Sequence, residues 1–149
     1  MVAVAIFAVL AGIALPNIFG MLGTAKYKEA ARGIASVLQD ARARAVSKNL
    51  EHRVVFDVDL KRYRLEQGNK ASGTASGDWT PVFSGWTTFQ AGVEMSGTTG
   101  CDNSDDRSIQ FNPTGTAQKE YICVMEGTTA KFKVGVTSSA TGRVAILDP

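Results

Sequence analysis

The chain has 149 residues, of which 44% are hydrophobic and 20% are charged, and its formal net charge is +2. A chain of this length holds one domain with a real core, and its composition excludes the disordered and collagen-like classes. The net charge is too small to imply nucleic-acid binding by charge alone. Composition therefore bounds the class of protein and leaves its function open.

The first segment of the chain, residues 1–22, carries no charged residue, and the first charge is Lys26. As a helix with a rise of ~1.5 Å per residue it would span roughly 33 Å, about the thickness of the hydrocarbon core of a bilayer. Residues 1–15 are apolar on all sides, whereas a core helix in so small a domain normally keeps a polar stripe. We therefore expect residues 1–23 to be a transmembrane segment; the alternatives are a buried core helix and a cleaved secretory signal.

The helical pattern continues beyond this apolar segment. Apolar residues at spacings of four, three and four form one stripe of an amphipathic helix, and these are Ile34, Leu38, Ala41 and Ala45. No proline or turn cluster separates the stripe from the apolar segment. The pattern predicts a single helix from Met1 to about Lys48, roughly 70 Å long at ~1.5 Å per residue.

The remainder of the chain shows the two-residue period of β-strands. Val54, Phe56 and Val58 alternate with other residues, and Tyr63 and Leu65 continue the pattern after a turn at 59–61. Residues 67–78 have the composition of a surface loop, and residues 112–115 that of a turn. Further strands are expected at 86–89, 93–96, 108–111, 120–125, 131–137 and 143–147. The fold class is therefore α+β: one long helix followed by about seven or eight antiparallel strands, with residues 24–149 forming the globular part.

Two cysteines are present, Cys101 in a polar loop and Cys123 in an apolar strand. A membrane anchor is compatible with an oxidising compartment, so we expect a disulfide between them, with a pair of unlinked thiols as the alternative. The disulfide would stabilise the domain by about 3 kcal/mol in the chain-entropy model.

No set of residues with catalytic or cofactor-binding spacing is found. His52 is the only histidine, so a catalytic triad or a zinc site has no partners to choose from. The acidic segment 102–106 resembles the start of a calcium loop, but Arg107 and Pro113 stand where that loop needs glycine and glutamate. We therefore expect no catalytic residue, no metal and no cofactor, and a structural or solvent-exposed role for His52.

Three aromatic residues, Trp79, Trp86 and Tyr121, lie near the ends of expected strands. They could form an exposed adhesive face or pack as core and rim residues, and we expect packing. The basic residues of the helix, among them Lys28, Arg32 and Arg42, are interpreted as its solvated face, or as contacts with lipid phosphates or neighbouring subunits.

The chain resembles a known family at several places. Residues 1–17, which end in Ile-Ala-Leu-Pro-Asn17, resemble the N-terminal helix of type IV pilins and type II secretion pseudopilins. Residues 41–49, 53–56, 109–115 and 141–144 are similar to the H-type pseudopilin (GspH) and FimT/FimU minor pilin branch of that superfamily. The resemblance covers nearly the whole chain.

The resemblance implies a pilin fold, in which the apolar first half of the helix protrudes and the second half packs on antiparallel sheets. Membrane and filament-core contacts would then fall on Val4, Phe7, Leu10, Leu15, Pro16 and Phe19. It also implies a single-pass inner-membrane protein with a periplasmic domain, which later enters an extracellular or periplasmic filament. The implied partners are other pilin or pseudopilin subunits through their N-terminal helices, the inner membrane and its assembly machinery, and prepilin peptidase acting on a full-length precursor.

The chain departs from the family at its beginning. Members are made with a short basic leader that ends in glycine, and after cleavage they begin with a methylated residue and carry a glutamate shortly afterwards. Neither the leader nor the glutamate is present, so we expect either that the sequence starts several residues inside the helix or that it is a variant without the glutamate. A missing basic leader would also reconcile the topology with the positive-inside rule, since Lys26 and Lys28 follow the apolar segment.

The leading functional interpretation is a minor pilin or pseudopilin that primes or caps a filament. A major filament-forming subunit is one alternative, and a DNA-receptor minor pilin for natural transformation is another. The DNA-binding relatives carry a C-terminal Gly-Arg-x-Arg, whereas here Gly142 and Arg143 are followed by Val144 and Ala145. One arginine releases few counterions on binding DNA, so we expect no nucleic-acid partner. In the DNA-receptor alternative, Arg143 is the candidate DNA contact. A hydrolytic surface enzyme is a remote third interpretation.

Overall fold

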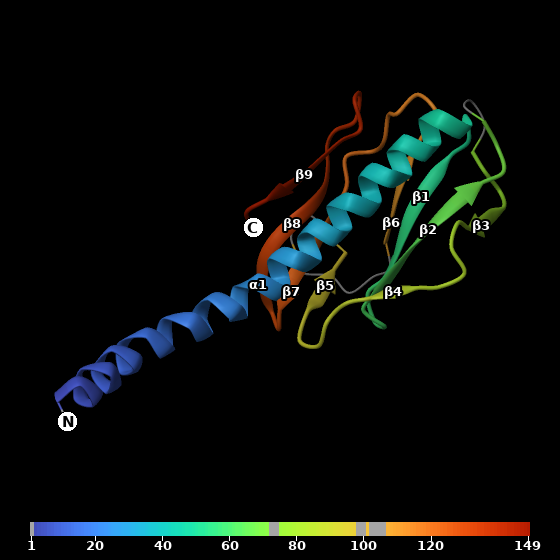
Figure 1. Cartoon of the computed structure of the whole chain (residues 1–149). Helices are drawn as coiled ribbons and strands as arrows, with labels where there is room; N and C mark the ends of the chain where they lie inside the picture. The colour runs from blue at the N-terminus through green and yellow to red at the C-terminus, as the bar shows by residue number, and fades with distance from the viewer. Residues whose placement is uncertain (1, 72–74, 98–100, 102–106) are drawn as a thin grey trace.

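The computed structural model shows one long helix lying across two β-sheets (Figure 1). It describes the backbone of residues 2–71, 75–97, 101 and 107–149, and the side chains of these residues from Gly23 onward. Helix α1 (Val2–Lys48) is continuous, and its first half extends beyond the sheets while its second half packs against them (Figure 1). The expected α+β architecture with a single N-terminal helix is confirmed.

The stripe predicted on α1 faces the core. Ile34, Leu38, Ala41 and Ala45 are all 0% exposed. The alanines in the stripe let the helix approach the strands closely, while burying a side chain such as Leu38 contributes roughly 1.5–3 kcal/mol. The helix contacts strands of both sheets, and its second half is therefore an integral part of the core.

The first sheet is antiparallel and has the order β3-β2-β1-β6, with β4 also pairing with β2. Its strands are β1 (His52–Asp57), β2 (Arg62–Gly68), β3 (Trp79–Pro81), β4 (Thr87–Thr88) and β6 (Arg107–Phe111). Val54 lies opposite both Leu65 and Ile109, and all three are buried. The alternation read from the sequence thus sets which face of β1 meets the helix.

The second sheet is also antiparallel, with the order β5-β7-β8-β9. Its strands are β5 (Glu94–Ser96), β7 (Tyr121–Glu126), β8 (Thr129–Ser138) and β9 (Arg143–Leu147). Val134 and Val136 on β8 are fully buried, and the β8–β9 pairing shifts register between Val136 and Ser138. This irregularity lies next to the tip of the β8–β9 hairpin, which reaches the side of α1.

Two strands differ from the sequence prediction. β3 directly follows the expected loop 67–78, in a stretch where no strand was expected, because Pro81 and the polar residues before Trp79 hide the signal. Pro81 is tolerated because β3 is an edge strand. β4 is a two-residue pairing, Thr87–Thr88, within the expected strand 86–89. The turn at 112–115 is present, and in it the amide of Gly115 donates to the carbonyl of Asn112 at 2.8 Å.

The membrane and filament-core side chains named from the resemblance, from Val4 to Phe19, lie outside the described side chains. Within the part of the chain whose side chains are described, no helix is both long and apolar enough to cross a membrane. The acidic segment 102–106 also lies outside the described residues.

Candidate functional site

A disulfide joins Cys101 to Cys123, with their Cα atoms 5.6 Å apart. Cys123 lies in the middle of β7 and is fully buried, whereas Cys101 lies in the connection between β5 and β6. The bond therefore ties that connection to the centre of the second sheet. Both cysteines are in the disulfide, so neither is available as a nucleophile or metal ligand.

His52 is a buried residue of β1 and is 0% exposed. Its Nδ1 lies 2.9 Å from the carbonyl oxygen of Leu50, which can only accept, so the ring donates from Nδ1. Its Nε2 is buried without a hydrogen-bond partner. Burial is the main cause that lowers the pKa of His52, and this favours the neutral ring. The arrangement is that of a core histidine and offers no access to a substrate.

The outer face of the first sheet carries a cluster of arginines and tryptophans around a buried carboxylate. Glu66 is only 2% exposed, and its two oxygens accept hydrogen bonds from Arg53 and Arg64, each Nε at 2.7 Å. The guanidinium of Arg53 lies 4.1 Å from the ring centre of Trp79, and that of Arg64 lies 4.3 Å from Trp86. We call these five residues the Arg–Trp cluster. Both tryptophans, expected to pack as core or rim residues, are half-buried and pack against arginines.

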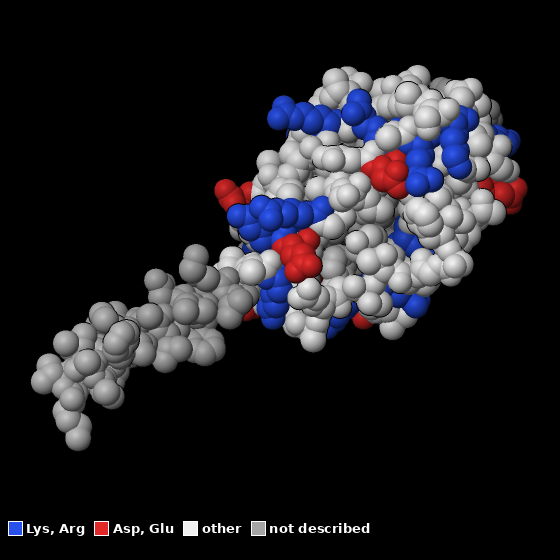
Figure 2. All heavy atoms as spheres, viewed as in Figure 1, with Lys and Arg blue, Asp and Glu red and all other residues white. Residues whose placement is uncertain are grey.

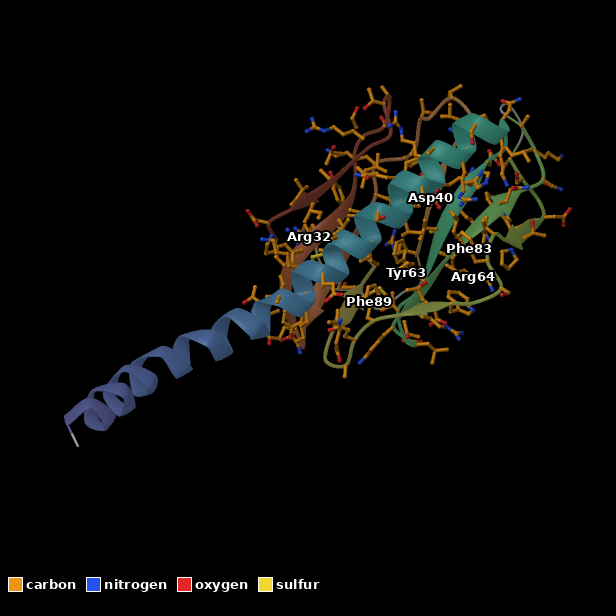
Figure 3. All side chains as sticks on the ribbon, in the orientation of Figure 1. Arg32, Asp40, Tyr63, Arg64, Phe83 and Phe89 are labelled. Carbon is orange, nitrogen blue, oxygen red and sulfur yellow. A yellow bond between two sulfur atoms is a disulfide. The ribbon has the colours of Figure 1, made fainter. Side chains whose placement is uncertain are left out.

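A groove of about 630 Å³ runs between α1 and the segment that precedes β4. Figure 3 shows Tyr63, Phe83 and Arg64 on one side of it and Asp40 on α1 on the other. Gly33 has no side chain to fill the groove, and a Cβ added there would contact only the Tyr63 hydroxyl, at 3.5 Å. The groove is mixed in polarity and holds no pair of groups suited to acid–base work.

A second hollow, which we call the hairpin pocket, lies between α1 and the tip of the β8–β9 hairpin and measures about 680 Å³. It contains Arg143, the candidate DNA contact, and brings it beside Arg42 of α1. Arg42 is positioned by a hydrogen bond from its Nε to the carbonyl of Gly115, at 3.2 Å. Gly142 has φ +58°, and a Cβ there would lie 2.1 Å from the same carbonyl oxygen. Glycine is therefore required for the hairpin tip to approach the 112–115 turn.

The sequence did not indicate that Arg42 and Arg143 share a pocket, because the contact depends on the placement of the hairpin against α1. Nor did it indicate that Glu66 is buried, because the cover comes from long arginine side chains. The described residues include no group of three or more potential metal ligands. What the arrangement offers is surfaces for contact: a protruding helix, a groove and a basic pocket.

Comparison with known proteins gives a consistent result. Residues 30–147 match the sequence profile of the family described as "Type II transport protein GspH". No curated protein sequence matches the chain significantly. The structure of the minor pseudopilin EpsH from the Type 2 Secretion System of Vibrio cholerae is similar, with a TM-score of 0.62 and 17% identity over 83% of this chain and 96% of that one. The type IV minor pilin FimU of Pseudomonas aeruginosa is similar with a TM-score of 0.51 and 18% identity, over 80% of this chain and 91% of that one.

Proposed function

Because the chain belongs to the GspH family of type II transport proteins, we propose that it is a minor pilin or pseudopilin, a structural subunit that primes or caps a filament. One observation carries the proposal: α1 extends beyond the sheets in its first half and is built into the core in its second half (Figure 1). A subunit of this shape can pack its protruding helix against other helices while its domain stays folded.

Residues 1–22 supply the surface for this packing, since they are uncharged. A helix that is apolar on all faces can exchange lipid for neighbouring helices with little change in solvation. We accordingly propose that the chain is anchored in the inner membrane with its domain in the periplasm before it enters the filament. The Cys101–Cys123 disulfide supports an oxidising compartment.

The proposed partners are other pilin or pseudopilin subunits, the inner-membrane assembly machinery, and prepilin peptidase on the precursor. We propose a non-enzymatic role for the chain. The family description favours a secretion pseudopilus over a type IV pilus.

A DNA-receptor role is the second candidate, because Arg42 supplies beside Arg143 a second cation that the sequence motif lacks. Two cations in one pocket still give little counterion release, so we expect a dissociation constant for duplex DNA weaker than about 10 μM at physiological salt. Submicromolar binding that is abolished by Arg143→Ala would favour the receptor role.

The proposal is tested by deleting the gene and complementing it with the full chain or with a version that starts at Thr24. We expect deletion to reduce filament number or secretion, the full chain to restore it, and the shortened chain to fold without restoring it. The shortened chain should also leave the membrane fraction. Normal filaments and secretion after deletion, or full rescue by the shortened chain, would refute the proposal.

A further inference from the structure

The hairpin pocket is basic and has no counter-charge of its own. Its nine lining residues include Arg42 and Arg143 and no aspartate or glutamate. Among the residues that the structure describes, neither guanidinium forms an ion pair. In Figure 2, basic side chains gather at the upper edge of the molecule, in the region of the β8–β9 hairpin and the end of α1. The pocket is thus an unneutralised concave site.

The pocket is also fixed in shape. Gly142 and Gly115 are both buried, and the close approach between them locks the hairpin tip onto the turn. The hydrogen bond from Arg42 Nε to Gly115 holds the first guanidinium in place and leaves its terminal nitrogens free for a ligand. The backbone around the pocket and one of its two guanidiniums are therefore held in place before a ligand binds, and this lowers the cost of binding.

The rest of the lining carries no charge. Val46 is 53% exposed and offers an apolar surface, Ser47 and Thr141 add hydroxyl groups, and Gln39 adds an amide. Guanidinium groups bind carboxylates through paired hydrogen bonds, and valine offers contact for an aliphatic side chain next to the carboxylate. A phosphate backbone would instead need an extended row of cations, and the pocket has two in a compact hollow.

We propose that the hairpin pocket is a docking site for an acidic peptide segment of a neighbouring filament subunit, one that carries a carboxylate next to an aliphatic side chain. The inference rests on the proposed filament role and adds to it the chemistry of one contact. The same pocket faces away from the core stripe of α1, so an occupant can enter without unfolding the domain. The contact joins two different surfaces, as a heterologous interface in a helical filament requires.

Binding is tested on the full chain in detergent micelles by fluorescence anisotropy of a labelled seven-residue peptide of alternating glutamate and valine. The control peptide has glutamine in place of each glutamate. We expect the acidic peptide to bind at least about fivefold more tightly than the control, and its affinity to fall with added salt. Equal affinities for the two peptides would overturn the proposal.

The matched variants are Arg143→Gln in the pocket and Arg32→Gln on the exposed face of α1, which change the net charge equally. We expect Arg143→Gln to weaken peptide binding at least about fivefold without lowering the melting temperature, and Arg32→Gln to change it less than about twofold. Arg42→Lys, which keeps the charge but loses the planar fork, should weaken binding as well. Equal effects of Arg143→Gln and Arg32→Gln, or tighter Arg143-dependent binding of a 20-base-pair duplex DNA, would overturn it.

A photo-crosslinking amino acid in place of Ser47 tests the contact in cells. We expect a crosslink, in the isolated filament fraction, to a subunit peptide that contains aspartate or glutamate beside an aliphatic residue. Presence of the protein in the filament fraction without such a crosslink would overturn the docking site and leave the proposed function standing. Absence of the protein from that fraction would count against the proposed function itself.

Discussion

Replacing Glu66 by glutamine measures how much the Arg–Trp cluster depends on its central charge. Glu66 is 2% exposed and accepts hydrogen bonds from two guanidiniums, those of Arg53 and Arg64. Glutamine keeps one acceptor oxygen but turns an amide NH₂ toward an arginine that can only donate. Breaking a fully buried pair costs ~3–5 kcal/mol, and the arginine side chains here are 28% and 32% exposed and can be partly rehydrated. We therefore expect Glu66→Gln to lower the free energy of unfolding by about 2–3 kcal/mol.

Urea unfolding followed by circular dichroism measures this change in the full chain in micelles, and thermal unfolding should show a drop of roughly 6–12 °C. The matched control is Glu94→Gln, which removes the same charge from an exposed pair with Lys61, 2.7 Å apart. We expect the control to change stability by less than about 0.5 kcal/mol. If Glu66→Gln cost no more than Glu94→Gln, the reasoning that assigns a structural role to the buried charge would be refuted.

Three further predictions follow from single sites. The pKa of His52 is lowered by burial from its ordinary 6.5, so the unfolded chain takes up a proton at a higher pH than the folded protein. The contribution of His52 to the free energy of unfolding is therefore complete above pH 6.5 and is lost as the pH falls from 6.5 through the folded pKa. Urea unfolding at pH 8, 6.5 and 5.5 should show this loss, and equal stability at all three pH values would contradict it. Reduction of the Cys101–Cys123 disulfide, which spans 22 positions, should lower the free energy of unfolding by about 3 kcal/mol and release two thiols. Thiols that react in the denatured chain before any reduction would show that no disulfide exists. Gly33→Ala should raise stability by roughly 0.5–1 kcal/mol, because it replaces a helix-interior glycine by a residue whose Cβ would make an ordinary van der Waals contact with the Tyr63 hydroxyl, at 3.5 Å. Gly142→Ala should lower stability by about 2 kcal/mol or more, because its Cβ would overlap a carbonyl oxygen. Thermal melts of the two variants that shift in the same direction would refute this pairing.

The helix and the main strands could be read from the sequence because their signals are periodic and local. Ile34 and Leu38 repeat at helical spacing, Val54 and Phe56 repeat at strand spacing, and all four are fully buried. The burial of His52 was also within reach, since it has the same parity on β1 as Val54 and Phe56.

The features that escaped prediction depend on contacts between segments far apart in the chain. Glu66 points away from the core and is nevertheless buried, because Arg53 of the neighbouring strand and Arg64 cover it. Arg42 is held against the 112–115 turn by a hydrogen bond to the carbonyl of Gly115, 73 positions away in the chain. No local pattern reports such contacts, since each follows from how the two sheets are placed around α1.

The continuity of α1 has a mechanical consequence. No linker separates the part of the helix that extends beyond the sheets from the part that lies in the core. A pull on the extended part, along the helix axis, is therefore transmitted directly to buried residues such as Leu38 and Ala41. The load acts in shear across contacts with both sheets, and many side chains must slide together before any of them separates. The helix thus works as a continuous tether whose anchor is the hydrophobic core itself.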